Sequence, residues 1–408
     1  MSGIKQCRAC NSENIMHFFD LGDQPYANAL TKSCITAENT YPLSLSFCKD
    51  CSLVQLDYTA DPKELFSNYF WVTSTSSTAR EYAKSFCDKA LSRSSQDNNY
   101  VLEVASNDGT FLRPFKDKGI EVLGVDPALN IAKEAQKSGI PTNCNFFSES
   151  VAQDIISQKG YPSIVFARNV LPHVANLHDF VKGLQICCGD DSIMVLEVHY
   201  SGKIIDELHY DSIYHEHLCY FTLASLNNLL NKYSLYPFDI EFSPISGGSI
   251  VLYIKNKPIN KSVALVEFIN NEHNNGYNTF QRWQEFADNS FMHKKLLNNI
   301  INDQVNKNKR IIGYGASARS STMLNFCGIN SQKIYKIADQ NPLKQGLFTP
   351  GTKIEIINPD TALASNPDIV LLLAWNFKDE ILELLKEKYN YSGTVIIPLP
   401  FPPYSEEI

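Results

Sequence analysis

The stretch YVLEVASNDGTFLRPF, residues 100–115, predicts the fold of the middle of the chain. It begins with apolar residues typical of a buried strand, continues into a polar turn with Gly109, and ends in residues that favour the start of a helix. Three more apolar runs follow at 121–126, 163–170 and 192–199, with helical stretches between them. Strands that alternate with helices predict a mostly parallel, doubly wound α/β sheet.

The loops after these strands lie at one edge of the predicted sheet, where doubly wound folds bind their ligands. The first loop lacks the GxGxxG pattern of a dinucleotide site, and the second strand ends in Asp126, which can accept hydrogen bonds from a ribose diol. This combination favours a nucleoside cofactor without phosphates, such as S-adenosylmethionine. An ordinary α/β turn capped by Asp108 is the alternative. The residues assigned to cofactor binding are Glu103, Ser106, Asn107, Asp108, Gly109, Asp126 and Asn169.

Four of the eleven cysteines form two CxxC pairs near the N-terminus. Two such pairs are typical of a site in which four thiolates surround one Zn²⁺ ion. Four sulfur ligands leave no open coordination position, so the expected zinc is structural and takes no part in catalysis. The predicted ligands are Cys7, Cys10, Cys48 and Cys51, and four unrelated buried cysteines are the alternative.

The second half of the chain predicts another α/β unit. Residues 260–308 are polar and helical in character and are expected to connect two domains. A new strand–turn–helix pattern begins at 309–324, and further apolar runs follow at 333–339, 368–375 and 394–400. Strands again alternate with helices, which indicates a second sheet.

Composition excludes several classes of function. The chain has 408 residues, of which 44% are hydrophobic and 20% charged, the profile of a globular protein. Its formal charge of −8 argues against nucleic acid as the main partner. No apolar stretch reaches the roughly 18 residues of a membrane span, and the N-terminus lacks the apolar core of a signal peptide. We therefore expect a cytoplasmic protein without a membrane or nucleic-acid partner. The sequence leaves the oligomeric state open, with a monomer as the working expectation.

The motifs, taken in order, resemble those of the nucleotide-sugar C-methyltransferases, which include the C-3 methyltransferases of branched deoxysugar pathways. The motifs are CxxC…CxxC, LEVASNDGTFL, NVLPHV, YHEHLCYF, GGSIVLY, GYGASARSSTMLNF and DQNPLKQGLFTPGT, and they extend from Cys7 to about Pro400. The resemblance implies three domains: a zinc-binding domain at 1–68, a Rossmann-like S-adenosylmethionine-dependent methyltransferase domain at 69–258, and a Rossmann-like nucleotide-sugar-binding domain at 259–408.

The resemblance also implies functional residues. Within HYDSIYHEHLCYF, residues 209–221 and hereafter the 209–221 run, it places functional residues at Tyr214, Glu216 and His217, with His217 as the expected base. It adds His173 of NVLPHV and Tyr69, although Trp71 departs from the pattern around Tyr69. The nucleotide-linked keto-deoxysugar is expected between the second and third domains. The residues assigned to it are Gly248, Ser249, Gly315, Arg319 and Lys344.

These residue types suit C-methylation beside a ketone. The reaction removes a proton from carbon and forms an enolate that attacks the methyl group of S-adenosylmethionine. A histidine, with an ordinary pKa near ~6.5, is a suitable base at neutral pH. We expect His217 to take the proton, Glu216 to support its imidazolium, and Tyr214 to bind the enolate oxygen.

Several alternatives remain open from the sequence. His215 and His217 could bind a metal, or the 209–221 run could be an inert aromatic core. The pattern Gly313-x-Gly315-x-x-Ala318, with Asp339 after the next strand, also fits a dinucleotide site. That pattern would make the protein a nucleotide-sugar oxidoreductase that uses NAD(P). A zinc-containing interaction protein without catalytic activity is a third possibility.

Overall fold

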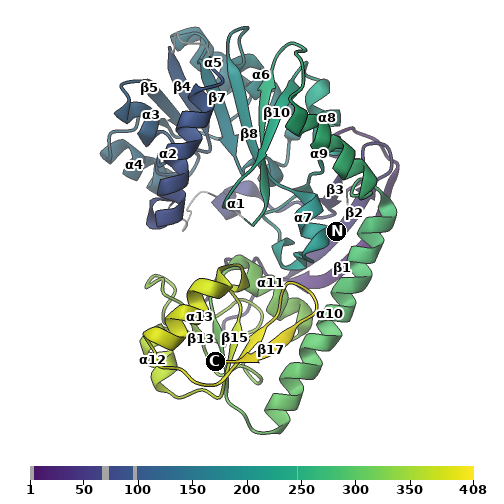
Figure 1. Ribbon diagram of the computed structural model, residues 1–408, viewed down its shortest axis with the longest axis vertical. Helices are drawn as coiled ribbons and strands as arrows, with labels where there is room; N and C mark the ends of the chain where they lie inside the picture. Colours follow the sequence, from purple (N-terminus) through teal and green to yellow (C-terminus); the bar gives the residue numbers. More distant parts are fainter. Residues whose placement is uncertain (1–3, 67–72, 95–98, 246) are drawn as a thin grey trace.

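The strands that the structure describes form three sheets, which we call the N-terminal, central and C-terminal sheets (Figure 1). The structure is a computed structural model that describes residues 4–66, 73–94, 99–245 and 247–408. In Figure 1 the central sheet lies at the top and the C-terminal sheet at the bottom, with the N-terminal strands between them and helix α10 (Phe280–Asn306) along one side. The predicted α/β class is confirmed.

The N-terminal sheet is antiparallel and takes its last strand from a distant part of the chain. Its order is β1-β2-β3-β9. Strand β9 pairs with β3 through Val54↔Tyr220 and Gln55↔Cys219, so the end of the 209–221 run completes this sheet. The elements are β1 (Ile15–Gln24), β2 (Tyr41–Cys48), β3 (Val54–Leu56) and β9 (Cys219–Tyr220), with α1 (Pro62–Phe66) and η1 (Thr73–Thr75) after β3.

The central sheet has the order β10-β11-β8-β7-β4-β5-β6. Strand β4 is parallel to both of its neighbours, β5 and β7, and the winding direction of the chain changes there. Such a change of direction opens the crevice in which doubly wound sheets bind their ligands. The strands are β4 (Tyr100–Val104), β5 (Glu121–Val125), β6 (Thr142–Asn143), β7 (Ile164–Arg168), β8 (Ile193–His199), β10 (Tyr236–Phe242) and β11 (Ser249–Lys255).

Helices cover both faces of this sheet, and short helical turns follow its strands (Figure 1). Strands β4, β7 and β8 are buried along nearly their whole length, which explains their continuous apolar runs. The helical elements are α2 (Ser77–Leu91), α3 (Arg113–Asp117), α4 (Leu129–Lys137), α5 (Glu149–Lys159), η2 (Leu171–His173), α6 (Leu177–Cys187), α7 (Ser201–Asp206), η3 (Tyr210–Ser212) and α8 (Leu223–Asn231).

The C-terminal sheet repeats the doubly wound plan with the order β14-β13-β12-β15-β16-β17. The Pro-rich tail, which the sequence suggests is a surface strap, ends in β17 and pairs antiparallel with β16. The elements are β12 (Ile311–Tyr314), α11 (Ala318–Cys327), β13 (Ile337–Ala338), β14 (Ile356–Ile357), α12 (Pro359–Ala364), β15 (Ile369–Leu372), η4 (Trp375–Phe377), α13 (Lys378–Glu387), β16 (Thr394–Ile397) and β17 (Tyr404–Glu407).

The polar segment 260–308 is helical, as predicted, and forms α9 (Val263–Asn274) and α10. Helix α10 has 27 residues and spans about 40 Å at 1.5 Å per residue. Its buried side chains recur at helical spacing, so one stripe faces the other units, and most of the rest is polar apart from the exposed Phe291 and Met292. None of the helices in the described ranges is both long and apolar enough to cross a bilayer.

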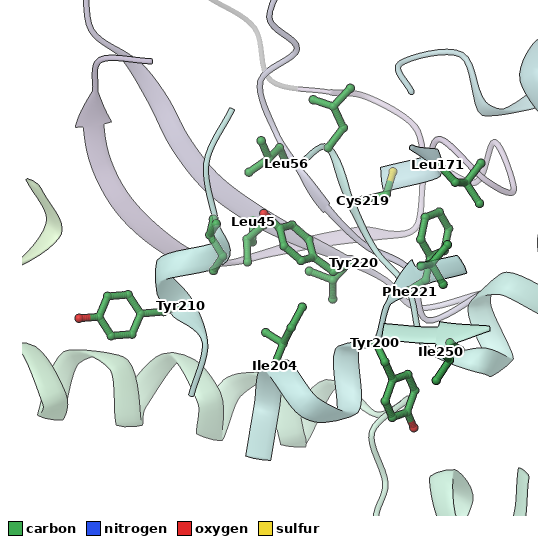
Figure 2. Close-up of a cluster of buried hydrophobic side chains, with 14 of the residues drawn as sticks. Leu45, Leu56, Leu171, Tyr200, Ile204, Tyr210, Cys219, Tyr220, Phe221 and Ile250 are labelled. Atoms are coloured by element: carbon green, nitrogen blue, oxygen red, sulfur yellow. The ribbon is translucent and has the colours of Figure 1, made fainter. Parts of the chain in front are cut away.

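The hydrophobic core is continuous between the units. Figure 2 shows Leu45 and Leu56 of the N-terminal sheet beside Tyr220 of the 209–221 run, and Ile250 of the central sheet closer to Phe221 and Tyr200. Tyr210, at the start of the same run, is fully buried against Phe326 of α11. The run is therefore packed by all three units, and their arrangement fixes its position.

Candidate functional site

The four cysteines of the CxxC pairs meet at one point, as predicted. Their sulfur atoms all lie within 4.8 Å of one another, with 3.5 Å between Cys7 and Cys51 and between Cys10 and Cys48. Tetrahedral zinc with Zn–S bonds of about 2.3 Å requires sulfur separations of about 3.8 Å, so this donor set fits the ion. All four are free thiols; Cys7, Cys48 and Cys51 are buried, and Cys10 is half-buried.

The backbone of each cysteine pair turns in the same way. The peptide N–H of Asn11 donates to Cys7 O at 2.9 Å, and that of Ser52 donates to Cys48 O at 2.9 Å. Asn11 and Ser52 have φ of 63° and 61°, a conformation that few residues other than glycine adopt readily. These two turns direct both cysteines of each pair toward a common centre. The CxxC spacing in the sequence predicted this arrangement.

The loop after β4 forms the predicted ligand turn at the reversal point of the central sheet. Ala105, Asn107 and Gly109 have φ of 58°, 49° and 77°. The Asn107 N–H donates to Asp126 Oδ2 at 2.8 Å, so the acid at the end of β5 holds the turn after β4. A Cβ on Gly109 would lie 2.8 Å from Ile140, so glycine also permits close packing there.

Three polar groups in this region are buried. Asp126 is 6% exposed, and burial raises its pKa; each of its oxygens accepts one backbone N–H and keeps a lone pair for a ligand hydroxyl. Burial raises the pKa of Glu103 well above its usual range. Glu103 Oε2 and Ser106 Oγ have no hydrogen-bond partner within the described ranges. The turn thus fits a ligand with hydroxyl and amino groups.

The side chains of Asn107 and Asp108 hold the segment before α2. Asn107 Oδ1 accepts from Thr73 N at 3.0 Å, and Asp108 Oδ2 accepts from Ser74 N at 2.9 Å. Sequence reasoning assigned both side chains to the cofactor and did not anticipate these contacts. Tyr69, expected to be functional, lies outside the described residues.

Asn169, after β7, joins two further strand ends. Its Nδ2 donates to the fully buried Glu197 at 2.9 Å, and its Oδ1 accepts from Ser249 Oγ at 3.0 Å. Glu197 in turn pairs with Arg168 at 2.8 Å. Asn169 has φ of 50°, which turns the chain away from the strand toward the histidine of η2. The assigned cofactor residue Asn169 and substrate residue Ser249 are therefore neighbours.

His217, in the second half of the 209–221 run, is half-buried and lies beside the rings of His173 and Tyr214. Its Nδ1 is 2.7 Å from the Ser212 carbonyl oxygen, and because a carbonyl only accepts, Nδ1 carries the proton. Its Nε2 is 3.0 Å from the Tyr214 hydroxyl, which donates to it. Burial, followed by the neighbouring His173 and His199, lowers the pKa of His217 well below its usual range. The ring is therefore neutral, with its lone pair on Nε2.

His173 stands next to this ring. The two ring centroids are 4.8 Å apart, and His173 Nδ1 donates to the backbone oxygen of Glu216 at 2.7 Å. Burial lowers the pKa of His173 to about 4. The Glu216 carboxylate points elsewhere: Oε1 accepts from Asn28 Nδ2 at 2.6 Å. The polar contacts recorded for His217 are with Ser212 and Tyr214, so the expected support of its imidazolium by Glu216 is not a direct contact here.

His215 is enclosed by tyrosines of the N-terminal unit. Its ring centroid lies 5.3 Å from Tyr26, 6.0 Å from Tyr41 and 5.9 Å from Tyr58, and its Nε2 donates to Tyr41 O at 3.3 Å. The described residues group no metal ligands around it, since the one cluster of three or more His, Cys, Asp or Glu ligands found there is the cysteine site. Its surroundings are those of an anchor, not of a metal ligand.

Asp211 fastens the start of the run to the C-terminal unit. It is fully buried and accepts from Arg319 Nη2 at 2.9 Å and from Trp375 Nε1 at 2.8 Å. The guanidinium carbon of Arg319 also lies 4.8 Å from the Trp375 ring centroid. Arg319, assigned to the substrate diphosphate, thus already pairs with a carboxylate. Sequence reasoning missed Asp211, because only its place before YHEH marks it.

The C-terminal turn after β12 holds the remaining substrate candidates. Gly315 has φ of 98°, and a Cβ there would lie 2.5 Å from Ala374 Cβ, so this glycine permits two strand ends to meet. Lys344 Nζ donates to Ala316 O at 2.7 Å and lies 3.7 Å from Asp339 Oδ2. The turn therefore carries a cation beside the N-terminus of α11.

Gly248 lies across the interface, in the hairpin between β10 and β11. Its φ is 105°, and a Cβ on it would lie 2.7 Å from Lys203 Cγ. The preceding Gly247 comes close to Arg319, because a Cβ there would lie 3.3 Å from Nη1. The hairpin thus reaches the C-terminal unit.

Three family models match successive segments of the chain. A putative zinc binding domain matches residues 7–66, a methyltransferase domain matches 78–237, and a C-methyltransferase C-terminal domain matches 244–400. Over 404 residues the chain is 30% identical to C-methyltransferase NovU of Streptomyces niveus, covering 98% of this chain and 96% of that protein. The chain belongs to the C-methyltransferase family. It is a methyltransferase that uses S-adenosylmethionine, with a zinc-binding domain at its N-terminus.

Solved structures of methyltransferases resemble part of this C-methyltransferase. A SAM-dependent methyltransferase from Archaeoglobus fulgidus matches 43% of this chain and 94% of its own, with 15% identity and a TM-score of 0.36. The magnesium protoporphyrin IX methyltransferase ChlM from Synechocystis, solved with bound SAM, matches 43% of this chain and 79% of its own, with 13% identity and a TM-score of 0.32. The assignment rests on the full-length relative and the family models, which favour methyl transfer over the oxidoreductase and interaction-protein alternatives.

Proposed function

We propose that this enzyme methylates a ring carbon, C-3, beside the ketone of a nucleotide-activated 4-keto-deoxysugar, through an enolate formed by His217. The observation that carries the proposal is the state of the His217 ring. Ser212 fixes the proton on Nδ1, so the basic Nε2 is presented at the place where the three units meet. The sugar substrate and the ring carbon follow from the motif resemblance.

A neutral imidazole is ready to accept a proton. Burial keeps His217 uncharged at neutral pH, so nearly every molecule carries a free base. The same burial disfavours the imidazolium, which therefore needs a negative charge nearby. The enolate oxygen supplies that charge when the C–H bond breaks, so proton removal and charge stabilisation occur together.

The Tyr214 hydroxyl can donate a hydrogen bond either to His217 Nε2 or to the enolate oxygen of the substrate. Its hydroxyl donates to His217 Nε2 at 3.0 Å before substrate arrives. A rotation of that hydroxyl toward the substrate oxygen would release Nε2 for the α-proton and stabilise the enolate, a role worth about 3–4 kcal/mol where the geometry is good. His173, 4.8 Å from His217 between ring centroids, bounds the other side of the base.

The central turn is the place we assign to S-adenosylmethionine, which supplies the electrophilic methyl group. The Asp126 carboxylate keeps acceptor capacity for the ribose hydroxyls, and Asn169 lies across the crevice. The turn between Ser106 and Gly109 offers neutral and acidic side chains, which suit a ligand with a positive sulfonium and no phosphate.

The C-terminal turn is the place we assign to the diphosphate of the sugar nucleotide. Lys344 and the N-terminus of α11, a helix of ten residues, both favour a negative ligand. Arg319 faces the same interface, although its pairing with Asp211 makes it a link between units first and a phosphate ligand second. Gly248 and Ser249 border the sugar from the opposite side.

Exchange of the sugar α-proton with solvent deuterium tests the base. His217→Asn should abolish both methyl transfer and deuterium uptake, because the side chain that accepts the proton is gone. His178→Asn, which changes a half-buried histidine bonded to Tyr233, should retain both. Full deuterium uptake in the His217 variant would reject the assignment of the base, and methylation of a different atom by the native enzyme would reject the substrate.

A further inference from the structure

The loop between β1 and β2 extends from the zinc-binding unit to the other parts of the active site. Residues 25–40 form this loop, and Asn28 at its near end is exposed. The Asn28 Nδ2 donates to Glu216 Oε1 at 2.6 Å, across 188 positions of sequence. A residue of the zinc-binding unit therefore contacts the carboxyl beside the proposed base.

The far end of the same loop is anchored on the C-terminal unit. Thr31 and Phe348 exchange two backbone hydrogen bonds, of 3.0 and 2.8 Å. Glu38 pairs with Lys353 at 2.8 Å and accepts from the Gly351 N–H at 2.8 Å. The loop is thus held at several points, and the amide of Asn28 reaches Glu216 from a fixed support.

The ionised form of the Glu216 carboxyl is stabilised by the hydrogen bond from Asn28. Its side chain is 5% exposed, and burial raises its pKa to about 7, while the Asn28 hydrogen bond acts in the opposite direction. His173 bonds to the Glu216 backbone oxygen, His215 and His217 adjoin it in sequence, and three tyrosines surround the His215 ring. Without Asn28, the ionised carboxylate would lose a hydrogen bond in a buried position.

The backbone of Glu216 connects the two histidines of the site. Its backbone oxygen accepts from His173 Nδ1 at 2.7 Å, and its next residue is His217. A displacement of residue 216 as a whole would therefore shift the histidines at 173 and 217 together. Small displacements of this kind reduce turnover strongly, because catalysis depends on alignment of the reacting atoms.

We propose that Asn28 is a positioning residue of the active site, through which the zinc-binding unit holds the Glu216 carboxyl and the two adjoining histidines in their reactive arrangement. The inference rests on the proposed function only in treating Glu216 and its neighbours as the active site. The zinc-binding unit then contributes to catalysis through one side-chain amide, in addition to its contribution to stability.

The first test measures the ionisation of Glu216 without any turnover. Protein labelled with carbon-13 at glutamate carboxyls is titrated by NMR, and Glu216→Gln identifies the signal. Because the Asn28 donor favours the ionised form, Asn28→Ala should move the midpoint to higher pH, by about half a pH unit or more. Asn39→Ala, a change at an exposed position of the same loop, should leave the midpoint in place. An unmoved midpoint in Asn28→Ala would overturn the proposal.

The second test uses steady-state kinetics. Asn28→Ala should lower kcat about tenfold and leave KM for S-adenosylmethionine within about twofold, because alignment and not cofactor binding is affected. In a Glu216→Ala background the Asn28 change should have no further effect. Losses that multiply, or an unchanged kcat despite a shifted midpoint, would show that the contact does not position the site. If the NMR midpoint shifts while the native enzyme fails to methylate any keto-sugar nucleotide, the proposed substrate is wrong and the Asn28 contact stands.

Discussion

The central and C-terminal sheets begin with the same local design and differ in charge. In the central sheet, Asn107 N donates to Asp126 Oδ2 at 2.8 Å; in the C-terminal sheet, Ala316 N donates to Asp339 Oδ2 at 2.7 Å. In both, the other oxygen accepts the N–H of the residue two positions further on, at 2.9 and 2.8 Å. An acid after the second strand thus secures the turn after the first strand twice in one chain.

The two turns differ in the cation beside the acid. Lys344 lies 3.7 Å from Asp339, whereas no ion pair is recorded for Asp126 within the described ranges. Burial raises the pKa of Asp126, and the central turn has three residues with positive φ. A turn with a lysine suits a phosphate, and a turn without one suits a positively charged cofactor. The difference agrees with the proposal that the central turn binds S-adenosylmethionine and the C-terminal turn binds the sugar nucleotide.

Replacing the two acids should separate the two ligands. Asp126→Ala should weaken S-adenosylmethionine binding at least 100-fold, about 2.7 kcal/mol, because both the turn and the ribose lose their acceptor. Binding of a nucleoside diphosphate should change less than about twofold, and Asp339→Ala should give the reverse pattern. Isothermal titration calorimetry with each ligand measures both. Equal losses for both ligands in one variant would remove the distinction between the turns.

Adding a methyl group to each turn should show how tightly each is packed. Gly315→Ala places a Cβ 2.5 Å from Ala374 Cβ and 3.0 Å from its backbone nitrogen, which cannot rotate away. Gly109→Ala meets only the side chain of Ile140, which can adjust. We expect a loss of about 2 kcal/mol in the free energy of unfolding at position 315 and about 1 kcal/mol at position 109. Denaturant melts of both variants provide the comparison, and a larger loss at position 109 would contradict it.

Removing the positive charge of Lys344 should weaken ligand binding at the C-terminal turn and leave binding at the central turn unchanged. Lys344→Met should weaken nucleoside diphosphate binding about tenfold, because one charge-assisted contact is lost, and leave S-adenosylmethionine binding unchanged. Lys309→Met serves as the control, since Lys309 pairs with Asp368 on the surface. Unaltered diphosphate affinity in the Lys344 variant would place the phosphates elsewhere.

The smallest expected difference between the two turns is in how salt affects the affinity for their ligands. Raising the ionic strength from about 0.05 to about 0.5 M should weaken nucleoside diphosphate binding about threefold, because screening acts on a multiply charged ligand. S-adenosylmethionine affinity should change less than about twofold over the same range. Matching salt dependence for the two ligands would show that Lys344 does not define the electrostatics of its turn.

The sequence predicts the parts of this molecule that depend on local pattern. Apolar runs separated by helical stretches predicted a doubly wound central sheet and a second α/β sheet, and the spacing of Cys7, Cys10, Cys48 and Cys51 predicted the clustered thiols. The turn after β4 was recognised from its single glycine and the acid that ends β5. Each strand, turn and CxxC pair is encoded within a few neighbouring residues, and the matching chemistry of the two pairs indicates that they meet.

The contacts that arrange the candidate site have no such local signal. The pairing of Asn28 with Glu216 and that of Asp211 with Arg319 join positions far apart in sequence, and each depends on how whole units pack. The same holds for His215, whose tyrosine enclosure comes from strand β2 and two loop positions of another unit. The chemistry of these side chains shows that they need hydrogen-bond or ring partners. Which residues become the partners depends on how the three units pack together.

The pairing of β9 with β3 has a consequence for synthesis of the chain. The N-terminal sheet is complete only when Val54 pairs with Tyr220. More than half of the polypeptide must therefore be synthesised before β3 can pair with its last neighbouring strand. Until then the edge of β3 is open to other chains, a condition that favours aggregation. Early capture of the metal ion by Cys7 and its three companions would protect the nascent segment during that interval.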